Sequence, residues 1–484
     1  MEVPKQKDIR NEQLELELFP EEATESPEQG QSEVAAEKEP ERKSSGERAI
    51  RNEDIVLRNE TMAFIVSYKT MEDAFRKVAS NKGSAGVDGM TCDELMPYFH
   101  KHWQEMREAL LGRTYKPTSV KRVEIPKDNG KTRSLGIPTV IDRGVQQAVA
   151  TVLSWIYEPI FSDSSFGFRP GRSAHDALRR CVRYANDGYE WVVDMDLEKY
   201  FDTVPQSKLL EMVSQTVKDG RVISLLYKFM KAGVVMPDGV VIGSEQGIPQ
   251  GGPLSPVLAN IMLDRCDKEL EKRGLRFVRY ADDMMTFAKS KRSAERIMES
   301  ITRFIENKLK LKVNREKTVV RKITDNVKFL GHSFWRNNEG RIALGIHEKS
   351  MTKMKGALKE ITARKTNLSW EQLKVRLSQK ITGWISYFRY ANAKNKLQAL
   401  DEWLRHRIRC LIFRRYWRPR SRYAFFTRNC NAKHEDALKI ANARQGFWAF
   451  SGFHQVSKWV SNNLLRRAGY TFLYDVYQRV HTAI

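Results

Sequence analysis

The sequence predicts an α+β protein, with strands in its first two-thirds and mainly helices in its last third. An apolar hairpin spans 277–287 and carries two adjacent aspartates at its turn. A second apolar strand begins near 190 and runs into a group of acidic residues. After about residue 345 the apolar residues recur with helical spacing, most clearly at 370–388 and 400–417.

The chain is strongly basic, and its charge is unevenly placed. Its 484 residues hold 83 Lys+Arg against 60 Asp+Glu, a net charge of +23, with a pI near 9.7. Residues 1–50 hold 7 basic against 14 acidic residues, whereas residues 401–484 hold 16 against 5. A basic domain of this kind is typical of proteins that bind phosphate backbones. Residues 1–48, rich in Glu, Ser, Gln and Pro, are expected to form a disordered acidic tail.

The first ordered element is expected to be a helix from about Asn59 to Val78, where apolar residues follow a helical period. The glycine-rich stretch after it, 81–89, is not a phosphate-binding loop. No strand precedes this stretch, and no Gly-Lys-Ser/Thr sequence closes it.

Residues 124–133 are predicted to form a second hairpin, around a turn that contains glycine. This hairpin carries Lys127 on one arm and Arg133 on the other. Lysine as a point charge and arginine as a planar fork can together hold a triphosphate. Two solvated basic side chains on a surface hairpin fit the same residues equally well.

A loop with two arginines, Arg169 and Arg172, precedes a helix predicted at 174–185. Ser173 stands at the expected N-cap of this helix, which explains the serine without any binding role.

The aspartates at 282–283 repel each other by roughly 4 kcal/mol when about 4 Å apart at an effective dielectric near 20. A divalent cation would resolve this repulsion, and Mg²⁺ favours a few carboxylates together with substrate phosphates. Asp196 is a third candidate ligand, with Asp194 and Asp202 as rivals that spacing alone does not exclude. Two metal ions held between neighbouring strands suit an in-line phosphoryl displacement. An ordinary Asp-Asp turn is the alternative.

Between these acidic segments lies a loop at 246–256 with three glycines and three prolines. Such a composition prevents regular structure and lets the backbone approach a ligand closely. A plain loop before a helix that starts near Pro256 is the alternative.

Together these segments resemble the motifs of reverse transcriptases, in that family's order. The sequence at 280–283, Tyr-Ala-Asp-Asp, resembles the YxDD box. Residues 196–202 resemble the first palm motif, 246–256 the Pro-Gln-Gly-Gly box, and 311–318 and 327–334 the last two palm motifs. The resemblance implies a right-hand polymerase fold, with fingers and an antiparallel palm sheet at 107–335, preceded by an N-terminal extension at 49–106.

The resemblance also implies roles for single residues. An aromatic residue follows the metal-binding aspartate by five positions in the first palm motif, so Phe201 selects Asp196 over Asp194. The implied catalytic residues are Asp196, Asp282 and Asp283, and the implied ligands of two Mg²⁺ ions are Asp196, Leu197, Asp282 and Asp283. The residues implied for dNTP binding are Lys127, Arg133, Phe201 and Gln250. Arg169 and Arg172 would touch the template.

The last third resembles the maturase region of reverse transcriptases encoded by group II introns. Its sequence at 383–388, Gly-Trp-Ile-Ser-Tyr-Phe, resembles the signature of that domain. We therefore expect an α-helical thumb/maturase domain at 345–420 and a small C-terminal DNA-binding region at 421–484. Arginines interleaved with tryptophan and tyrosine suit RNA, and those expected to bind it are Arg405, Arg409, Arg414, Arg415 and Arg418. A thumb helix with merely solvated arginines is the alternative.

The sequence also bears on what the protein lacks and where it works. No His-Asn-His pattern with cysteine pairs follows the DNA-binding region, so we expect no built-in endonuclease, as in the group IIC lineage. The five cysteines are scattered without Cys-x₂-Cys spacing, and no signal peptide or long apolar run is present. These features predict a reducing compartment, the bacterial cytoplasm, and no membrane partner.

The leading hypothesis is an RNA-directed DNA polymerase that copies intron RNA into cDNA and assists splicing. The expected partners are group II intron RNA, an RNA template with a DNA or RNA primer, target DNA and dNTPs. One alternative is a reverse transcriptase domesticated for DNA repair or phage defence. Another is an RNA-binding maturase that only promotes splicing.

Overall fold

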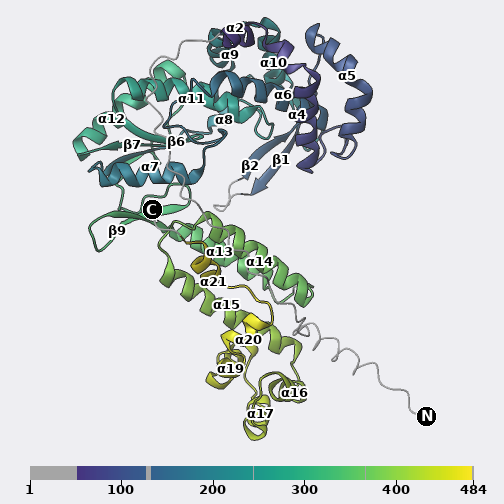
Figure 1. Cartoon of the computed structure of the whole chain (residues 1–484), viewed down its shortest axis with the longest axis vertical. Helices are drawn as coiled ribbons and strands as arrows, with labels where there is room; N and C mark the ends of the chain where they lie inside the picture. Colours follow the sequence, from purple (N-terminus) through teal and green to yellow (C-terminus); the bar gives the residue numbers. More distant parts are fainter. Residues whose placement is uncertain (1–51, 127–131, 244, 366, 482–484) are drawn as a thin grey trace. The chain divides into compact units, whose positions relative to one another are not determined.

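The computed structural model describes residues 52–126, 132–243, 245–365 and 367–481, with the side chains of 52–55 and Arg133 excepted. These residues fall into two compact units, 52–329 and 330–481 (Figure 1). The acidic tail expected at 1–48 and the Lys127 of the predicted triphosphate clamp lie outside the described residues.

A four-stranded antiparallel sheet forms the centre of the first unit. Its strands lie in the order β6 (Arg276–Tyr280), β7 (Asp283–Ala288), β3 (Trp191–Met195) and β8 (Val319–Lys322). Helix α12 packs on β3, β7 and β8, while α7 and α11 pack on β6. These helices span Lys291–Phe304, Ala174–Asn186 and Ser255–Lys272, respectively. The predicted hairpin at 277–287 and helix at 174–185 are confirmed, and Ser173 forms a capping box with Asp176.

A second sheet, in the order β2-β1-β4-β5, lies in the same unit. Its strands are β1 (Val120–Pro126), β2 (Thr132–Ile137), β4 (Val234–Val235) and β5 (Val241–Ile242). The predicted hairpin at 124–133 is confirmed as β1 and β2, which pair antiparallel from Lys121–Ile137 to Pro126–Thr132. Its turn lies outside the described residues.

The first unit also contains further helices. They are α2 (Asn52–Asn59), α3 (Thr61–Ile65), α4 (Tyr68–Ser80), α5 (Leu95–Leu111), α6 (Val140–Tyr157), the short α8 (Tyr200–Thr203), α9 (Gln206–Thr216), α10 (Gly220–Lys231) and the π-helical turn η1 (Ile305–Leu309). The single helix predicted at 59–78 is two helices, because Ser67 caps α4 through the Thr70 amide and starts a new helix there.

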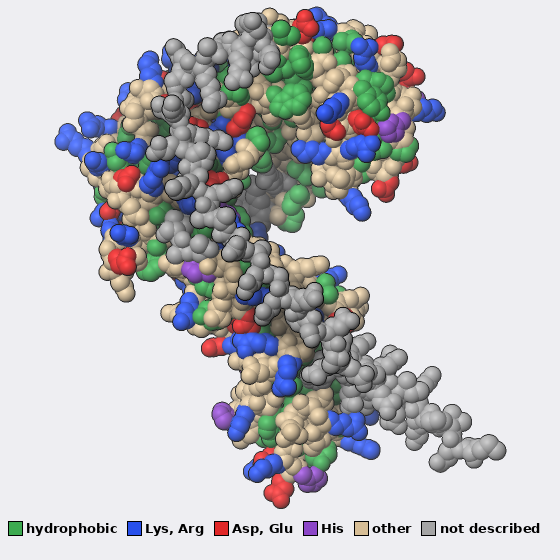
Figure 2. Space-filling view, viewed as in Figure 1, with side chains coloured by type: hydrophobic (Ala, Val, Ile, Leu, Met, Phe, Trp, Pro, Cys, Tyr) green, Lys and Arg blue, Asp and Glu red, His purple; other side chains and the backbone are tan. Residues whose placement is uncertain are grey.

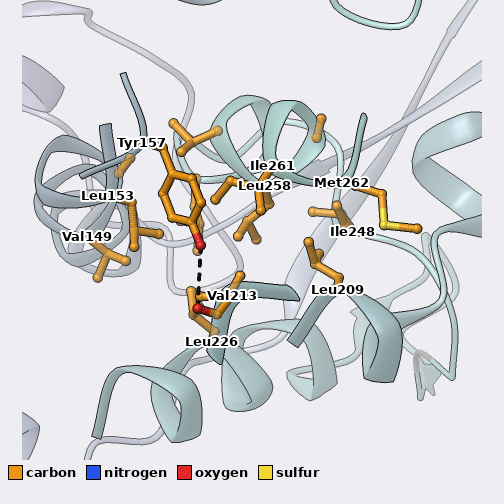
Figure 3. Close-up of a cluster of buried hydrophobic side chains, with 14 of the residues drawn as sticks. Val149, Leu153, Tyr157, Leu209, Val213, Leu226, Ile248, Leu258, Ile261 and Met262 are labelled. Atoms are coloured by element: carbon orange, nitrogen blue, oxygen red, sulfur yellow. Dashed lines mark hydrogen bonds between the residues drawn. The ribbon is translucent and has the colours of Figure 1, made fainter. Parts of the chain in front are cut away.

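The core of the first unit lies where α6, α9, α10 and α11 meet (Figure 3). Apolar residues one helical turn apart, such as Val149 and Leu153 on α6, face Val213 on α9 and Leu258 on α11. The hydroxyl of the buried Tyr157 donates to the Val213 carbonyl at 3.4 Å. This packing fixes α11, which supports the sheet edge that carries the aspartates.

The second unit is mainly helical. The hairpin of β9 (His332–Arg336) and β10 (Ile342–Ile346) opens it. The helices are α13 (Glu348–Ile361), α14 (Trp370–Tyr387), α15 (Lys394–Arg415), α16 (Pro419–Asn429), α17 (His434–Ala441), α18 (Phe447–Ser451), α19 (His454–Trp459), α20 (Asn462–Arg467) and α21 (Leu473–Val480). Helix α21 packs on α14 and α15, and α18 packs on α15. No helix among the described residues is long and apolar enough to cross a membrane.

Candidate active site

The aspartate turn, residues 280–283, joins β6 to β7. Tyr280 and Asp283 pair across the two strands, so Ala281 and Asp282 alone form the connection. Ala281 adopts a left-handed φ of +58°, a conformation that residues other than glycine adopt at an energetic cost. The turn that presents the two carboxylates is therefore strained.

Strand β3 brings the third carboxylate to the aspartate turn. Met195 pairs with Met284, so Asp196, the next residue, comes opposite Asp283. Opposed residues of an antiparallel pair lie on one face of the sheet. The Asp196 amide donates to Thr318 Oγ1 at 3.2 Å, which holds the end of this strand in place.

The carboxylates repel one another in this arrangement. Loss of hydration, followed by the like charges of Asp282, Asp194 and Asp196, raises the pKa of Asp283 to about 6, while Lys328 acts in the opposite direction. Asp283 nevertheless remains open to solvent. A cation at this place would therefore relieve a repulsion that the fold itself creates.

The structure does not choose between Asp194 and Asp196 as the ligand. Burial raises the pKa of Asp194, and Arg321, at 3.9 Å from its carboxylate, opposes this effect. Asp196 pairs with Lys317, whose Nζ lies 3.2 Å from Oδ2. The third rival, Asp202, is exposed and lines a pocket whose walls include β1 and β2. The preference for Asp196 continues to rest on the resemblance.

The donor set fits a hard divalent cation, because carboxylate oxygens are the ligands that Mg²⁺ prefers. The carboxylates do not surround a single point where an ion could sit. In the described part of the chain, no group of three or more His, Cys, Asp or Glu side chains is arranged to hold a metal as it stands.

A pocket of about 420 Å³ opens in the same unit. Phe201 and Gln250, the two residues expected to shape a nucleotide pocket, both line it. The other walls come from β1, β2, the β4–β5 hairpin and the loop 243–250. The structure thus brings Phe201 and Gln250 together in one cavity beside the predicted phosphate-binding hairpin.

Glycines in the 246–256 loop permit its close approach to the pocket walls. Gly247 has a φ of +87°, and a Cβ there would lie 2.7 Å from the Phe201 carbonyl oxygen. Gly251 has a φ of +119°, and its Cβ would lie 2.4 Å from the Gly136 carbonyl oxygen. The Gly136 amide donates to the Gln250 carbonyl at 2.6 Å. Both positions therefore require glycine.

Basic residues also reach the pocket. Arg133 lies on β2, where its backbone pairs with Ile125, and its side chain is outside the described atoms. Arg122 and Lys199 line the pocket although the sequence did not single them out. Arg122 also donates to the Ser134 hydroxyl. Strand alternation offered a signal, because Val120 and Arg122 share one face of β1 and both line the pocket.

The expectation that Arg169 touches the template needs correction, whereas the same expectation for Arg172 stays a prediction. Arg169 is buried and pairs with Glu158 at 2.8 Å, and its Nη1 donates to the carbonyls of Ser162 at 2.5 Å and Ser165 at 2.8 Å. Arg172 pairs with Asp163 at 2.6 Å. Arg169 therefore ties the loop to the end of α6 and has no surface to offer a phosphate, while Arg172 makes its 2.6 Å ion pair within the loop and is only partly buried.

Most of the predicted RNA-binding arginines of α15 make contacts with other residues of the second unit. Arg409 is buried and donates to the Val460 carbonyl at 2.9 Å, and burial lowers its pKa to about 10. Arg415 stacks on Trp370, with its guanidinium carbon 3.9 Å from the ring centre. The expected RNA contact of Arg409 is therefore corrected to a structural role, while that of Arg415, which is only partly buried, stays a prediction.

Arg405 and Arg414 lie over the rings of Phe472 and Phe447 at 5.6 and 5.3 Å and are partly exposed. Arg418 is exposed and lies over the exposed ring of Trp417 at 4.9 Å. Lys and Arg side chains are spread over the visible faces of both units (Figure 2). Arg418 with Trp417 is thus the most exposed part of the predicted RNA surface.

Comparison with known proteins matches two families. The family described as reverse transcriptase (RNA-dependent DNA polymerase) matches residues 125–334. The family described as group II intron, maturase-specific domain matches residues 351–430. The first match contains the aspartate turn, Asp196, Phe201 and Gln250, and the second contains α14 and α15.

Three relatives show how much of the chain is shared. Protein YkfC of Escherichia coli (strain K12) is 34% identical over 360 residues, which cover 66% of this chain and 93% of YkfC. The group II intron-encoded protein LtrA of Lactococcus lactis subsp. cremoris is 32% identical and covers 56% of this chain and 55% of LtrA. The putative COX1/OXI3 intron 2 protein of Saccharomyces cerevisiae is 30% identical, covering 54% of this chain and 37% of its own length. The chain thus spans about half, or less, of the two intron-encoded relatives.

Proposed function

Because this chain belongs to the reverse transcriptases of group II introns, with a maturase domain, we propose that it copies intron RNA into cDNA and binds that RNA to assist splicing. The main support for the polymerase activity is the register of β3 and β7. Its last pair, Met195 with Met284, brings Asp196 opposite Asp283. The raised pKa of Asp283, caused by lost hydration and by its acidic neighbours, supports a cation at this place.

In this proposal Asp196, Leu197, Asp282 and Asp283 hold two Mg²⁺ ions. Bound there, the ions supply charge stabilisation to the in-line attack of a primer hydroxyl on a nucleotide phosphate. Phe201 and Gln250 confine the sugar and base of the dNTP within the 420 Å³ pocket. Lys127, Arg133 and the newly identified Arg122 hold its phosphates. Positioning and charge stabilisation carry such phosphoryl transfers.

The test of the polymerase half is cDNA synthesis on a primed RNA with Mg²⁺. Asp282→Ala and Asp283→Ala are each expected to lower the rate by about 100-fold or more, because they remove preorganised charge. Asp93→Asn, an exposed carboxylate on another part of the unit, is the matched control and should leave the rate unchanged. A folded wild-type protein that incorporates no nucleotide would contradict the proposal.

The maturase half rests on the second family match, at 351–430. We place the RNA contact on Trp417 and Arg418, together with the partly exposed Arg405 and Arg414 of α15, and a contact with target DNA on residues 421–484. The test is the splicing rate of the intron RNA encoded around the gene, with and without protein. An unchanged splicing rate would remove this half and leave the polymerase standing.

We further propose that the protein works in the bacterial cytoplasm. All five cysteines are free, and four of them are buried. This usage is that of a reducing compartment.

A further inference from the structure

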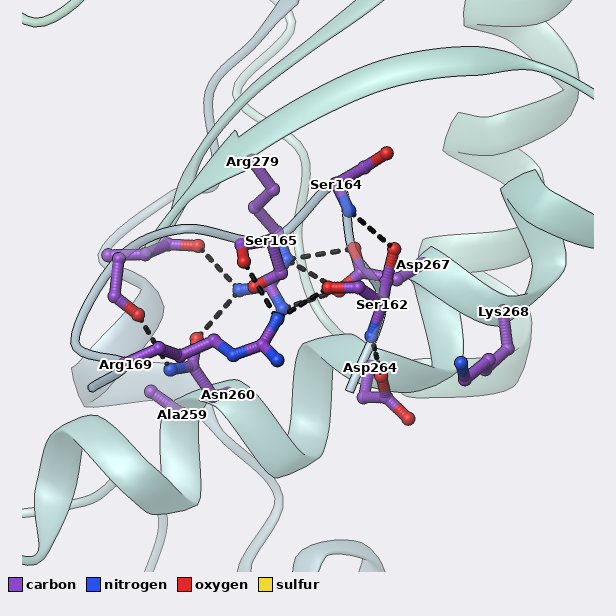
Figure 4. Close-up of polar contacts among 12 residues, drawn as sticks. Ser162, Ser164, Ser165, Arg169, Ala259, Asn260, Asp264, Asp267, Lys268 and Arg279 are labelled. Atoms are coloured by element: carbon purple, nitrogen blue, oxygen red, sulfur yellow. Dashed lines mark hydrogen bonds and ion pairs between the residues drawn. The ribbon is translucent and has the colours of Figure 1, made fainter. Parts of the chain in front are cut away.

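A buried arginine, Arg279, forms a hydrogen bond with the backbone of the aspartate turn. Arg279 lies on β6, three residues before Asp282, and its side chain is almost fully buried. It forms a bidentate ion pair with Asp267 of α11, through Nε at 2.8 Å and Nη2 at 2.5 Å (Figure 4). Because the two bonds to Asp267 fix the plane of the guanidinium group, its remaining N–H groups point in set directions and can donate to further acceptors.

Those remaining donors point at the turn. Arg279 Nη1 donates to the carbonyl of Ala281 at 2.9 Å and to Oδ1 of Asn260 at 2.9 Å. Ala281 is the residue with the left-handed φ of +58°. The strained residue therefore has its carbonyl fixed by a buried charge that is itself anchored on a helix.

Asn260 carries the network to the other side of the turn. Its Nδ2 donates to the Gly167 carbonyl at 2.9 Å. Gly167 lies so close to the turn that a Cβ on it would be 2.4 Å from the Ala281 amide nitrogen. The backbone of Arg279 also bonds the same loop, because its amide donates to Ser164 and its carbonyl accepts from Phe166, both at 2.9 Å.

We propose that Arg279, relayed by Asn260, is a positioning residue that fixes the backbone of the aspartate turn and so sets where Asp282 and Asp283 present their carboxylates. Among the described residues neither side chain donates to the carboxylates of Asp282 or Asp283, and neither lines the 420 Å³ pocket, although Arg279 and Asp282 line one small cavity together. Their effect on the reaction is exerted through the Ala281 carbonyl and the Gly167 loop. The inference rests on the proposed polymerase function, to which it adds residues that the metal site requires.

The network offers variants that separate positioning from folding. Removing Arg279 alone would leave Asp267 buried without a partner, whereas replacing both members of a buried ion pair by apolar residues is often tolerated. The primary variant is therefore Arg279→Met combined with Asp267→Leu. Asn260→Ala, within α11, removes only the relay and introduces the best helix former.

The matched control is Ser165→Ala. Ser165 lies in the same loop, yet its buried hydroxyl has no hydrogen-bond partner among the described residues. Removing an unpartnered hydroxyl should change neither folding nor rate. Arg279→Lys tests the geometry, since a lysine can pair with Asp267 but cannot donate to Asn260 and Ala281 together.

The experiment measures kcat and KM for dNTP together with Mn²⁺ affinity, the latter by electron paramagnetic resonance on protein without substrate. The double variant is expected to lower kcat by about 100-fold and Asn260→Ala by about 10-fold, as displacement of reacting groups does. KM for dNTP should stay constant, Mn²⁺ should bind more weakly, and Arg279→Lys should recover only part of kcat.

Folded variants with wild-type kcat and wild-type Mn²⁺ affinity would overturn the positioning role. If the double variant does not fold, the kcat and the Mn²⁺ affinity of Asn260→Ala test the positioning role instead. A wild-type protein that binds Mn²⁺ but incorporates no nucleotide would defeat the polymerase function instead. The Mn²⁺ comparison between wild type and variants would then still decide the role of Arg279.

Discussion

At the scale of single residues, the first unit holds a carboxylate whose charge opposes folding. Asp264 on α11 is buried, and its Oδ1 accepts a hydrogen bond from the Ser162 amide at 3.3 Å. Burial, and then the like charge of Asp267, raise the pKa of Asp264 to about 6, against the influence of Lys268 and Arg279. The stability that this group contributes is present at low pH and is lost as the pH rises through about 6.

We predict that Asp264→Asn stabilises the protein at pH 8 and does so only about half as much at pH 5, where the carboxyl is ionised in the unfolded chain but still protonated in the folded one. The amide oxygen can still accept from Ser162, while the costly charge is gone. The gain in the free energy of unfolding should be on the order of 1–3 kcal/mol, since one unit of pKa corresponds to about 1.4 kcal/mol. Urea unfolding at the two pH values measures it, with the exposed Asp436→Asn as control. An equal gain at both pH values would contradict the cause given.

At the scale of secondary-structure elements, α21 depends on a cap that another helix supplies. Asp401 on α15 accepts the first amides of α21, from Leu473 and Tyr474, both at 2.8 Å. These amides have no partner within their own helix. Burial raises the pKa of Asp401 to about 6, so the cap offsets a desolvation cost.

Asp401→Ala is expected to lower the stability of the second unit by about 1–2 kcal/mol, as the loss of a helix cap does. Hydrogen exchange locates the effect, because the amides of Leu473 and Tyr474 should lose protection before those of α14. Asp436→Ala, an exposed acidic residue in the first turn of α17, is the control. Unchanged exchange at the start of α21 would show that the cap is dispensable.

At the scale of the whole molecule, the net charge of +23 governs how the protein meets nucleic acid. Binding to phosphate backbones releases counterions, so affinity should fall linearly with salt on logarithmic axes. Arg418 and Trp417 make separable contributions, because only one of them is charged.

We predict that Arg418→Gln reduces the slope of this salt dependence by about 0.7, the value for one phosphate contact on a single strand. Trp417→Ala should weaken RNA binding by about 1–3 kcal/mol, the range for one stacked base, at an unchanged slope. Filter binding of the intron RNA across a salt series measures both. Lys439→Gln on α17 is the matched control for charge alone. A change of slope in Trp417→Ala would assign the ring a different role.

The sequence predicted the elements that carry the carboxylates, because their patterns are local. The hairpin at 277–287 follows from alternation around an Asp-Asp turn, and the cap at Ser173 follows from its place before an apolar period. The same reasoning placed the start of α15 too late, since its first turn, from Lys394, is polar.

The arginines could not be predicted in this way. An arginine has an apolar stem and a fork of donors, so it suits a surface that meets RNA as well as a buried ion pair. Arg169 and Arg409 were expected at a nucleic-acid surface, yet Arg169 is buried against Glu158 and Ser165, and Arg409 against the Val460 carbonyl, 51 residues along the chain. Arg279 was overlooked for the same reason, because Asp267 and Asn260 reach it only through the tertiary fold.

The backbone hydrogen bond between Gly136 and Gln250 joins two walls of the 420 Å³ pocket. Gly136 belongs to β2, and Gln250 belongs to the glycine-rich loop whose Ile248 amide donates to the Phe201 carbonyl at 2.7 Å. A displacement of the hairpin is transmitted to Gln250 and onward to Phe201, with no side chain as intermediary. We therefore expect the width of the proposed nucleotide pocket to follow the position of the β1–β2 hairpin, through main-chain bonds alone.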